Sequence, residues 1–175
     1  MRHIALLRAI NVGGNSTIRM AELRSLGERL GFVSVTTLLQ SGNLTFEADE
    51  ADPSKLEQRC EKAVEEHFGV ATTFFIRTAP QWQALIEANP FTAEAREDPS
   101  HLLVLPAKDA IAETEVEALR GAIRGRESVA AGERCLYAVY PDGIGTSKLT
   151  NKVIERHLGT LVTGRNWNTV LKLAG

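Results

Sequence analysis

The chain has 175 residues, of which 43% are hydrophobic and 24% are charged, and its formal net charge is −2 at pH 7. This composition is typical of one compact domain or two small lobes, and it excludes collagen-like, linker-dominated and disordered chains. The nearly balanced charge argues against a protein that coats nucleic acid or an anionic membrane with its whole surface, but it is compatible with one basic face.

Six elements are predicted in the first half of the chain, in the order strand, helix, strand, strand, helix, strand. Apolar residues recur at helical spacing from Met20 and again after residues 52–53, an Asp-Pro pair typical of a helix start. The Ser-Gly-Asn sequence at 41–43, between two apolar runs, indicates a hairpin. This order is the split βαβ arrangement of a ferredoxin-like lobe. The predicted ranges are 3–9, 20–30, 32–40, 44–47, 53–68 and 71–78.

A bridging helix and a second lobe follow. Thr78 and Gln81 form a capping-box pattern for a helix that Asn89-Pro90 ends, before a polar stretch at 92–100. The second half then predicts strand, helix, two strands and two helices, a partial repeat of the first half without a clear final strand. These predicted elements are 102–105, a helix around 116–123, 128–131, 134–140, a helix from Ser147 to 158 that Ser147 caps, and a helix from Asn166.

We therefore expect an α+β fold of two ferredoxin-like halves that form one compact unit. The predicted domains are 1–78, a bridging segment at 79–100, and 101–175. Cys60 and Cys135 have no Cys or His neighbour at metal-ligand spacing, so we expect neither a disulfide framework nor a metal site. The apolar start of the chain is too short for a signal peptide, and no segment approaches the roughly 18 apolar residues of a membrane span, so we expect a cytoplasmic protein without a membrane segment.

Both ends of the chain are basic, while the middle is acidic. Residues 1–30 contain five Arg and two Glu, and residues 147–175 contain five Lys or Arg and one Glu. Acidic, solvent-exposed helices explain the middle of the chain, but they leave the basic ends unexplained.

The loop after the first strand is a candidate binding element. Arg8, Asn11, Gly13 and Gly14 lie between a predicted strand and a predicted helix, where successive backbone N–H groups can form an anion-binding nest. The loop lacks the Gly-Lys-Ser/Thr of a phosphate-binding P-loop and the spaced glycines of a dinucleotide fingerprint. A wide turn with glycines at positive φ is the structural alternative.

Two serines raise the question of nucleophilic catalysis. Ser41 lies between two predicted strands, whereas a nucleophile elbow needs a strand and a helix, so a hairpin is the favoured interpretation. Ser147 is interpreted as a helix cap. This interpretation puts Lys148 in the first helical turn, where the helix dipole disfavours a cation unless an anion lies nearby.

The segment 163–169 is the densest polar cluster. Arg165 offers a planar fork for carboxylate or phosphate, and Asn166 is a candidate helix cap. Trp167 fits an apolar stripe, so a place in the core is favoured over stacking on a base. The histidines share no metal-pair spacing, and no catalytic triad or acid pair can be assembled, so enzymatic activity and any cofactor are left open.

Five motifs occur in one order along the chain: LRAINVGG at 7–14, MAEL at 20–23, QSGN at 40–43, SKL at 147–149 and RNWNTV at 165–170. In this combination the sequence resembles the bacterial domain-of-unknown-function 1697 family from end to end. The resemblance implies an α+β fold of two ferredoxin-like halves in a cytoplasmic bacterial protein. It implies no activity, because the family has none assigned.

The resemblance picks out polar and backbone-permissive residues that core packing does not require. If the strand-end loop, the hairpin and the two C-terminal helix starts meet, they surround a small volume with amide donors and three cations. We therefore expect binding of a small anionic or phosphorylated ligand, with nucleotides among the candidates. The predicted site residues are Arg8, Asn11, Gly13, Gly14, Ser41, Asn43, Lys148, Arg165, Asn166 and Asn168.

Two other functions stay open. A ferredoxin-like sheet is the platform of RNA-recognition domains, but the aromatic residues of the predicted strands follow no RNA-binding motif. A nucleic-acid or protein interaction module therefore ranks second. The third alternative is that the polar motifs form a hydrogen-bond network that holds the fold and binds no ligand.

Overall fold

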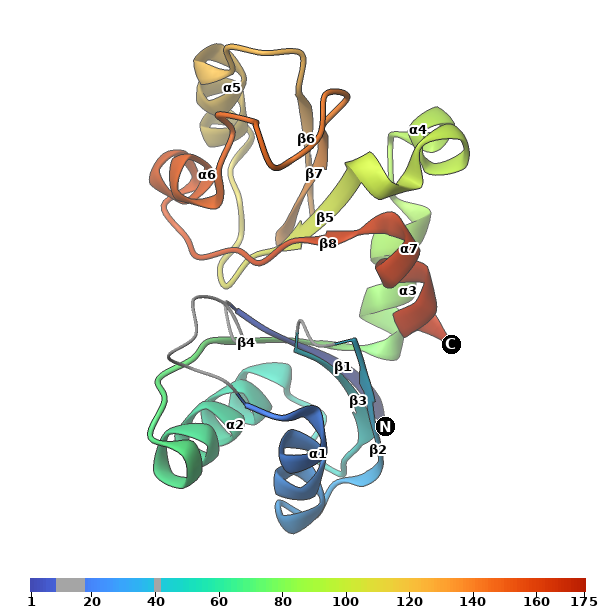
Figure 1. Cartoon of the computed structure of the whole chain (residues 1–175), viewed down its shortest axis with the longest axis vertical. Coiled ribbons are helices and arrows are strands. Elements are labelled where there is room, and N and C mark those ends of the chain that lie inside the picture. The colour runs from blue at the N-terminus through green and yellow to red at the C-terminus, as the bar shows by residue number, and fades with distance from the viewer. Residues whose placement is uncertain (9–17, 40–41) are drawn as a thin grey trace. The chain divides into compact units, whose positions relative to one another are not determined.

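The computed structural model of the protein describes residues 1–8, 18–39 and 42–175. The chain divides into two compact units, one formed by Met1–Gln83 with Ala174 and the other by Ala84–Leu173 with Gly175. Each unit contains one four-stranded antiparallel sheet with helices (Figure 1). The predicted α+β fold class with two similar halves is therefore confirmed.

The first unit has the element order predicted from the sequence. Its sheet has the strand order β2-β3-β1-β4, and all neighbouring strands are antiparallel. The hydrophobic core lies on the face of this sheet that the two helices cover. The elements are β1 (Arg2–Leu7), α1 (Met20–Arg29), β2 (Val33–Leu38), β3 (Asn43–Glu47), α2 (Pro53–Phe68) and β4 (Phe74–Thr78).

Local signals set the ends of α2. The Asp52 side chain accepts a hydrogen bond from the N–H of Ser54 at 2.9 Å, and Pro53 occupies the first turn, where its missing N–H costs nothing. Gly69 ends the helix in the left-handed conformation, with φ of 68°. Both predicted ends of this helix are confirmed.

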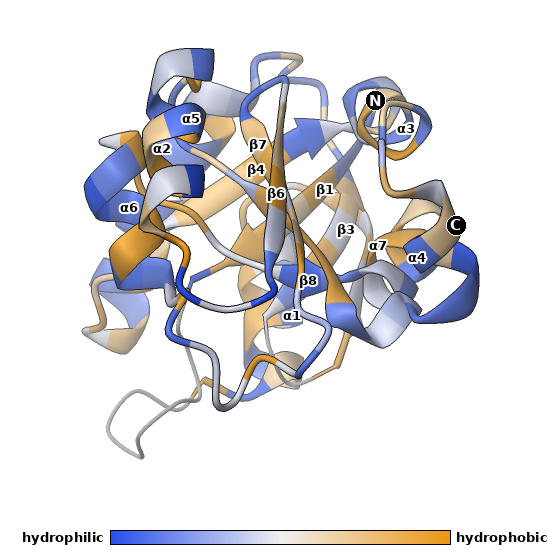
Figure 2. Ribbon diagram, turned by 90° about the horizontal axis from the view of Figure 1, so that it is seen from above, coloured by the Kyte–Doolittle hydropathy of each residue, from blue (hydrophilic) through white to orange (hydrophobic). Residues whose placement is uncertain are grey.

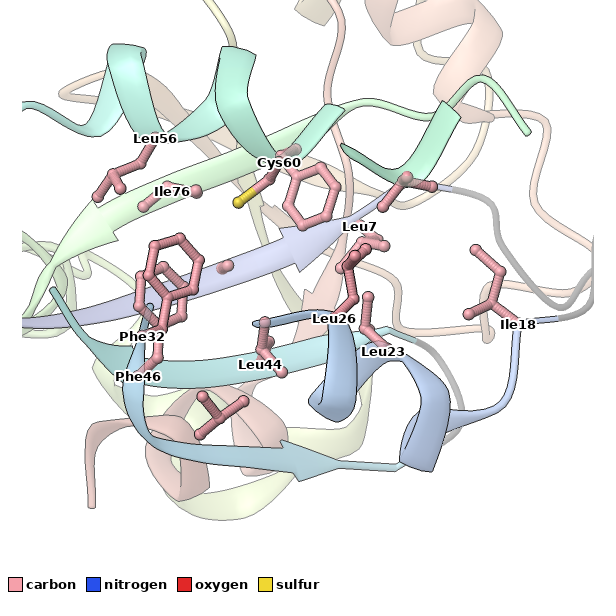
Figure 3. Packing of buried hydrophobic residues seen from close by; sticks show 14 of the residues in the cluster. Leu7, Ile18, Leu23, Leu26, Phe32, Leu44, Phe46, Leu56, Cys60 and Ile76 are labelled. Carbon is pink, nitrogen blue, oxygen red and sulfur yellow. The ribbon is translucent and has the colours of Figure 1, made fainter. Parts of the chain in front are cut away.

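Figure 3 shows the core of the first unit, where α1 and α2 pack on the sheet. The rings of Phe32 and Phe46 stack with centroids 4.2 Å apart. Cys60 of α2 is buried in this cluster, and burial raises the pKa of its thiol to about 12. The Cys60 thiol is therefore protonated at neutral pH and acts as a small apolar side chain.

Two carboxylates of α2 close the outer edge of β4. The N–H of Ile76 donates to Glu57 Oε1 at 2.8 Å, and the N–H of Phe74 donates to Glu61 Oε1 at 2.9 Å. Because β4 is the last strand of its sheet, these are the N–H groups that an added strand would use. Because the two carboxylates already accept hydrogen bonds from these N–H groups, another strand cannot pair with them.

The helix α3 (Ala79–Glu87) connects the sheet of the first unit to the second. Its predicted capping box is confirmed: the N–H of Thr78 donates to Gln81 Oε1 at 2.9 Å, and the N–H of Gln81 donates to Thr78 Oγ1 at 3.3 Å. The helix contributes residues to both compact units, since the division falls after Gln83.

The second unit repeats the strand order of the first, as β6-β7-β5-β8, again antiparallel throughout. Its core lies on the face of the sheet that α5 and α6 cover. In Figure 2, which is coloured by hydropathy, β7 is mostly orange (hydrophobic), whereas α6 carries blue (hydrophilic) residues. The elements are α4 (Thr92–Glu97), the short 3-10 helix η1 (Pro99–His101), β5 (Leu102–Pro106), α5 (Glu113–Ala122), β6 (Ser128–Gly132), β7 (Cys135–Val139), α6 (Asn151–Leu158), β8 (Arg165–Asn166) and α7 (Trp167–Ala174).

Two features of the second unit differ from the sequence-based expectation. A final strand is present, because β8 pairs with Val104 and Leu103 of β5, but it has only two residues. The polar stretch 92–100 also contains α4 and most of η1. These elements are too short to produce a periodic apolar pattern, so sequence reasoning missed them. Within the described parts of the chain, no helix combines the length and the apolar character that a membrane crossing requires.

Candidate functional site

A pocket of about 440 Å³ opens in the second unit between the end of α5 and the helix α6. The end of α5 and the turn after it form one wall, and the segment before α6 together with one side of that helix forms the other. Three of its side chains carry a positive charge, and a fourth is a histidine. The lining residues are Gly121, Ala122, Ile123, Arg124, Gly125, Glu127, Lys148, Leu149, Val153, Arg156 and His157.

The three cations of the pocket are Arg124, Lys148 and Arg156, and all three are exposed. Among the residues that the structure describes, no carboxylate forms an ion pair with any of them. Elsewhere on the same unit, Arg120 bonds to Glu113 and Glu117, and Arg126 bonds to Asp142. The pocket thus gathers like charges that neighbouring side chains leave available to a ligand.

The segment before α6 is arranged differently from the prediction. The N-cap of α6 is Thr150, whose hydroxyl accepts a hydrogen bond from the N–H of Val153 at 3.3 Å, so the helix begins after Ser147 rather than at it. The Ser147 hydroxyl instead accepts from the N–H of Leu149 at 3.0 Å. The prediction that Ser147 caps the helix, with Lys148 in the first turn, is therefore wrong. Both Ser and Thr are good caps, and the sequence does not decide between them.

The imidazole of His157 is held by its own helix. Its Nδ1 lies 3.0 Å from the carbonyl oxygen of Val153. Because a carbonyl oxygen only accepts, Nδ1 carries the proton of this hydrogen bond. This leaves Nε2 as the nitrogen with which His157 can bind a ligand in the pocket.

Arg165 is a buried side chain of β8. Its Nη1 donates to Thr163 Oγ1 and to the carbonyl oxygen of Gly164, each at 2.9 Å. Burial lowers the pKa of the guanidinium to about 10, which still leaves it charged at neutral pH. These bonds hold the strand that precedes α7, and a role of Arg165 in ligand binding stays a prediction.

Asn166 is the N-cap of α7, as the sequence predicts. Its Oδ1 accepts a hydrogen bond from the N–H of Thr169 at 3.0 Å. Asn168, two residues later, is exposed, and Trp167 lies in the interior, only 6% exposed. The cap gives Asn166 a structural role that Asn168 does not share.

Replacing Asn166 with alanine is therefore expected to lower the free energy of unfolding by about 1 kcal/mol, the usual cost of a lost N-cap. Asn168→Ala is the matched control and should leave it within about 0.5 kcal/mol of the parent. Urea unfolding followed by circular dichroism measures both. Equal stability of the two variants would contradict a capping role for Asn166.

Asn43 has a structural role in the hairpin between β2 and β3. Its side chain is fully buried, and its Nδ2 donates to the carbonyl oxygen of Leu38 at 2.8 Å. The bond joins the end of one strand to the start of the next. Ser41, another residue of the predicted site, lies outside the described residues.

The N-terminal part of the predicted site is described only at Arg8. This residue follows β1, is half-buried, and bonds through its backbone to Thr72 and Thr73. Asn11, Gly13 and Gly14 lie outside the described residues. That these residues share one ligand with Lys148 and Arg165 stays a prediction.

Sequence reasoning missed Arg124, Glu127 and Arg156 as pocket residues. Arg156 belongs to the basic C-terminal segment, and that excess of basic residues was a usable signal. Arg124 and Glu127 carry no local signal, because only the packing of α5 beside α6 brings them to the pocket. Among the described residues, no group of three Asp, Glu, His or Cys side chains could hold a metal ion.

Comparison with known proteins agrees with this architecture. No curated protein matches the chain. A solved structure, that of the conserved bacterial protein SP0830 from Streptococcus pneumoniae, is similar with a TM-score of 0.78 and 23% sequence identity, and the match covers 99% of this chain and 96% of that one. At this identity the likeness shows the fold alone. Residues 1–137 match the family described as "Protein of unknown function (DUF1697)", and the chain therefore belongs to that family.

Proposed function

We propose that the protein binds a small anionic or phosphorylated ligand, and that the pocket between α5 and α6 is a binding site for it. The observation that carries the proposal is the convergence of Arg124, Lys148 and Arg156 on one pocket of about 440 Å³. Like charges that gather without ion-pair partners among the described residues repel one another, and a bound anion offsets that repulsion. Guanidinium groups match phosphate and carboxylate in two-point hydrogen bonds, and a lysine adds a point charge.

The proposal extends to the N-terminal loop predicted from the sequence. There Gly13 and Gly14 would supply backbone donors, with Arg8 and Asn11 beside them, for an anion of the same class. For Asn43, Arg165 and Asn166 the observed hydrogen bonds support the alternative that these residues hold the fold. We place the protein in the cytoplasm as part of the same proposal, because both of its cysteines are free thiols.

The nucleic-acid alternative loses its main support. Recognition of RNA on a sheet needs exposed aromatic rings on which bases stack. All six aromatic residues of the candidate strands are buried. They are Phe32, Phe46, Phe74, Phe75, Tyr137 and Tyr140.

Calorimetric titration of the full-length protein with inorganic phosphate and with sulfate tests the proposal. Lys148→Ala and Arg156→Ala are each expected to weaken phosphate binding about tenfold, since each removes a charge-assisted contact. Lys152→Ala is the matched control, because Lys152 is an exposed cation of the same helix that does not line the pocket. It should change the affinity less than about twofold.

Two results would overturn the proposed site. One is the absence of binding at anion concentrations up to about 10 mM, a range that detects even weak small-ligand sites. The other is an equal loss of affinity in the Lys152→Ala control, which would indicate attraction by overall charge rather than by the pocket. An Arg165→Ala variant that keeps phosphate affinity but melts several degrees lower would assign Arg165 to the fold.

A further inference from the structure

Glu127 places one carboxylate in the otherwise cationic pocket between α5 and α6. Its Oε1 accepts a hydrogen bond from the Ser147 hydroxyl at 2.6 Å. That hydroxyl in turn accepts from the N–H of Leu149, so the carboxylate is tied to the segment before α6. Gly125 leaves room for it, since a Cβ at this position would lie 2.5 Å from Glu127 Oε2. The carboxylate is therefore a fixed part of the pocket.

A fixed carboxylate does not suit a bare anion. It repels phosphate or sulfate oxygens and offsets part of the attraction of the cations. It accepts hydrogen bonds from hydroxyl groups, and such charge-assisted bonds are among the stronger ones. An ammonium group would also donate to Glu127, but Arg124, Lys148 and Arg156 line the same pocket and repel a positive ligand. The group that matches Glu127 is a neutral hydroxyl.

The size and lining of the pocket narrow the ligand further. Its volume of about 440 Å³ exceeds the space that an inorganic anion fills and is typical of small-molecule sites. Ile123, Leu149 and Val153 give it an apolar part. No Phe, Tyr or Trp is among its described lining residues, so the pocket offers a nucleobase none of the large aromatic rings on which bases stack best.

We infer that the ligand of this pocket is a phosphorylated polyhydroxy compound of the sugar-phosphate class. The cations hold its phosphate group, and Glu127 accepts hydrogen bonds from its hydroxyl groups. The inference rests on the proposed function, because the cations must bind the phosphate group of the ligand. It goes further in assigning to Glu127 the preference for a ligand that carries hydroxyl groups.

Calorimetric titration of the full-length protein with four probes tests the inference: inorganic phosphate, ribose 5-phosphate, ribose and AMP. Ribose 5-phosphate is expected to bind about tenfold more tightly than inorganic phosphate, the effect of one or two added charge-assisted hydrogen bonds. AMP should bind no more tightly than ribose 5-phosphate, because the described lining of the pocket offers its base no Phe, Tyr or Trp ring. Ribose alone should show no measurable binding.

Glu127→Gln separates the two contributions. The change removes the negative charge that opposes phosphate, so the affinity for inorganic phosphate should be kept or should rise. The preference for ribose 5-phosphate over phosphate should fall from about tenfold to about twofold, because an amide oxygen is a weaker acceptor than a carboxylate. Glu133→Gln, an exposed residue of the β6–β7 turn outside the pocket, is the matched control and should keep the tenfold preference.

The outcomes distinguish failure of this inference from failure of the proposed function. If no phosphate-bearing probe binds, both are overturned. If phosphate binds and ribose 5-phosphate binds no more tightly, or if AMP binds much more tightly than ribose 5-phosphate, the sugar-phosphate inference is wrong while the anion site stands. If Glu127→Gln keeps the full preference for ribose 5-phosphate over inorganic phosphate, Glu127 does not determine this preference, and its assigned role is wrong.

Discussion

Replacing Glu57 with alanine is expected to lower the free energy of unfolding by about 3 kcal/mol, the scale of breaking a buried ion pair from one side. Glu57 Oε1 lies 3.7 Å from Arg77 Nη1, and the two side chains are 6% and 5% exposed. The same carboxylate accepts the hydrogen bond of the Ile76 N–H at the edge of β4. The alanine variant leaves a buried guanidinium without this carboxylate and a buried N–H without an acceptor. Urea unfolding followed by circular dichroism measures the loss.

Two control variants separate the ion pair from the edge hydrogen bond. Glu57→Gln keeps an acceptor for the Ile76 N–H and removes only the charge, so its loss should be smaller than that of Glu57→Ala. Glu61→Ala removes the equivalent hydrogen bond to the Phe74 N–H from a half-buried carboxylate and should cost about 1 kcal/mol. If Glu57→Ala and Glu61→Ala destabilise the protein equally, the buried pair contributes nothing beyond the edge bond.

The features that the sequence predicts well depend on neighbouring residues. Asp52 with Pro53 starts α2, the Thr78 and Gln81 pair starts α3, and Asn166 caps α7, because each cap bonds to an N–H within a few residues. The order of strands and helices follows from apolar periodicity, which also acts over one element at a time. These signals suffice for the α+β class and for most elements.

The features that the sequence does not predict depend on contacts between distant segments. Nothing near Glu57 in the sequence indicates that its carboxylate accepts a bond from Ile76, nineteen residues later. The candidate pocket is of the same kind, because Arg124 and Lys148 come from segments that only the packing of α5 beside α6 brings together. Ser147 shows the limit within one segment. Two residues suited to capping, Ser147 and Thr150, precede α6, and in the structure Thr150 caps the helix while the Ser147 hydroxyl donates to Glu127.

Acidification is expected to destabilise the first unit through His3. This residue of β1 is fully buried, and its ring stacks on Phe46 with centroids 5.5 Å apart. Neither ring nitrogen has a hydrogen-bond partner in the described parts of the chain. Burial lowers the pKa of His3 below its ordinary value of 6.5, so the folded protein holds the neutral ring while the unfolded chain binds a proton more readily. The stability that the neutral ring allows is therefore complete above pH 6.5 and is lost as the pH falls from there toward the lowered pKa.

His3→Phe should remove this dependence and stabilise the protein at neutral pH. Phenylalanine keeps a ring that can stack on Phe46, and it removes two buried nitrogens without partners, a gain of about 1–3 kcal/mol in the free energy of unfolding. Urea unfolding between about pH 7.5 and about pH 5 measures both effects, with His67→Gln on the exposed surface of α2 as the control. The control should keep the parent's loss of stability on acidification, because it leaves the buried ring of His3 in place. If His3→Phe loses stability with falling pH as steeply as the parent, protonation of His3 is not the cause of the acid-dependent loss of stability.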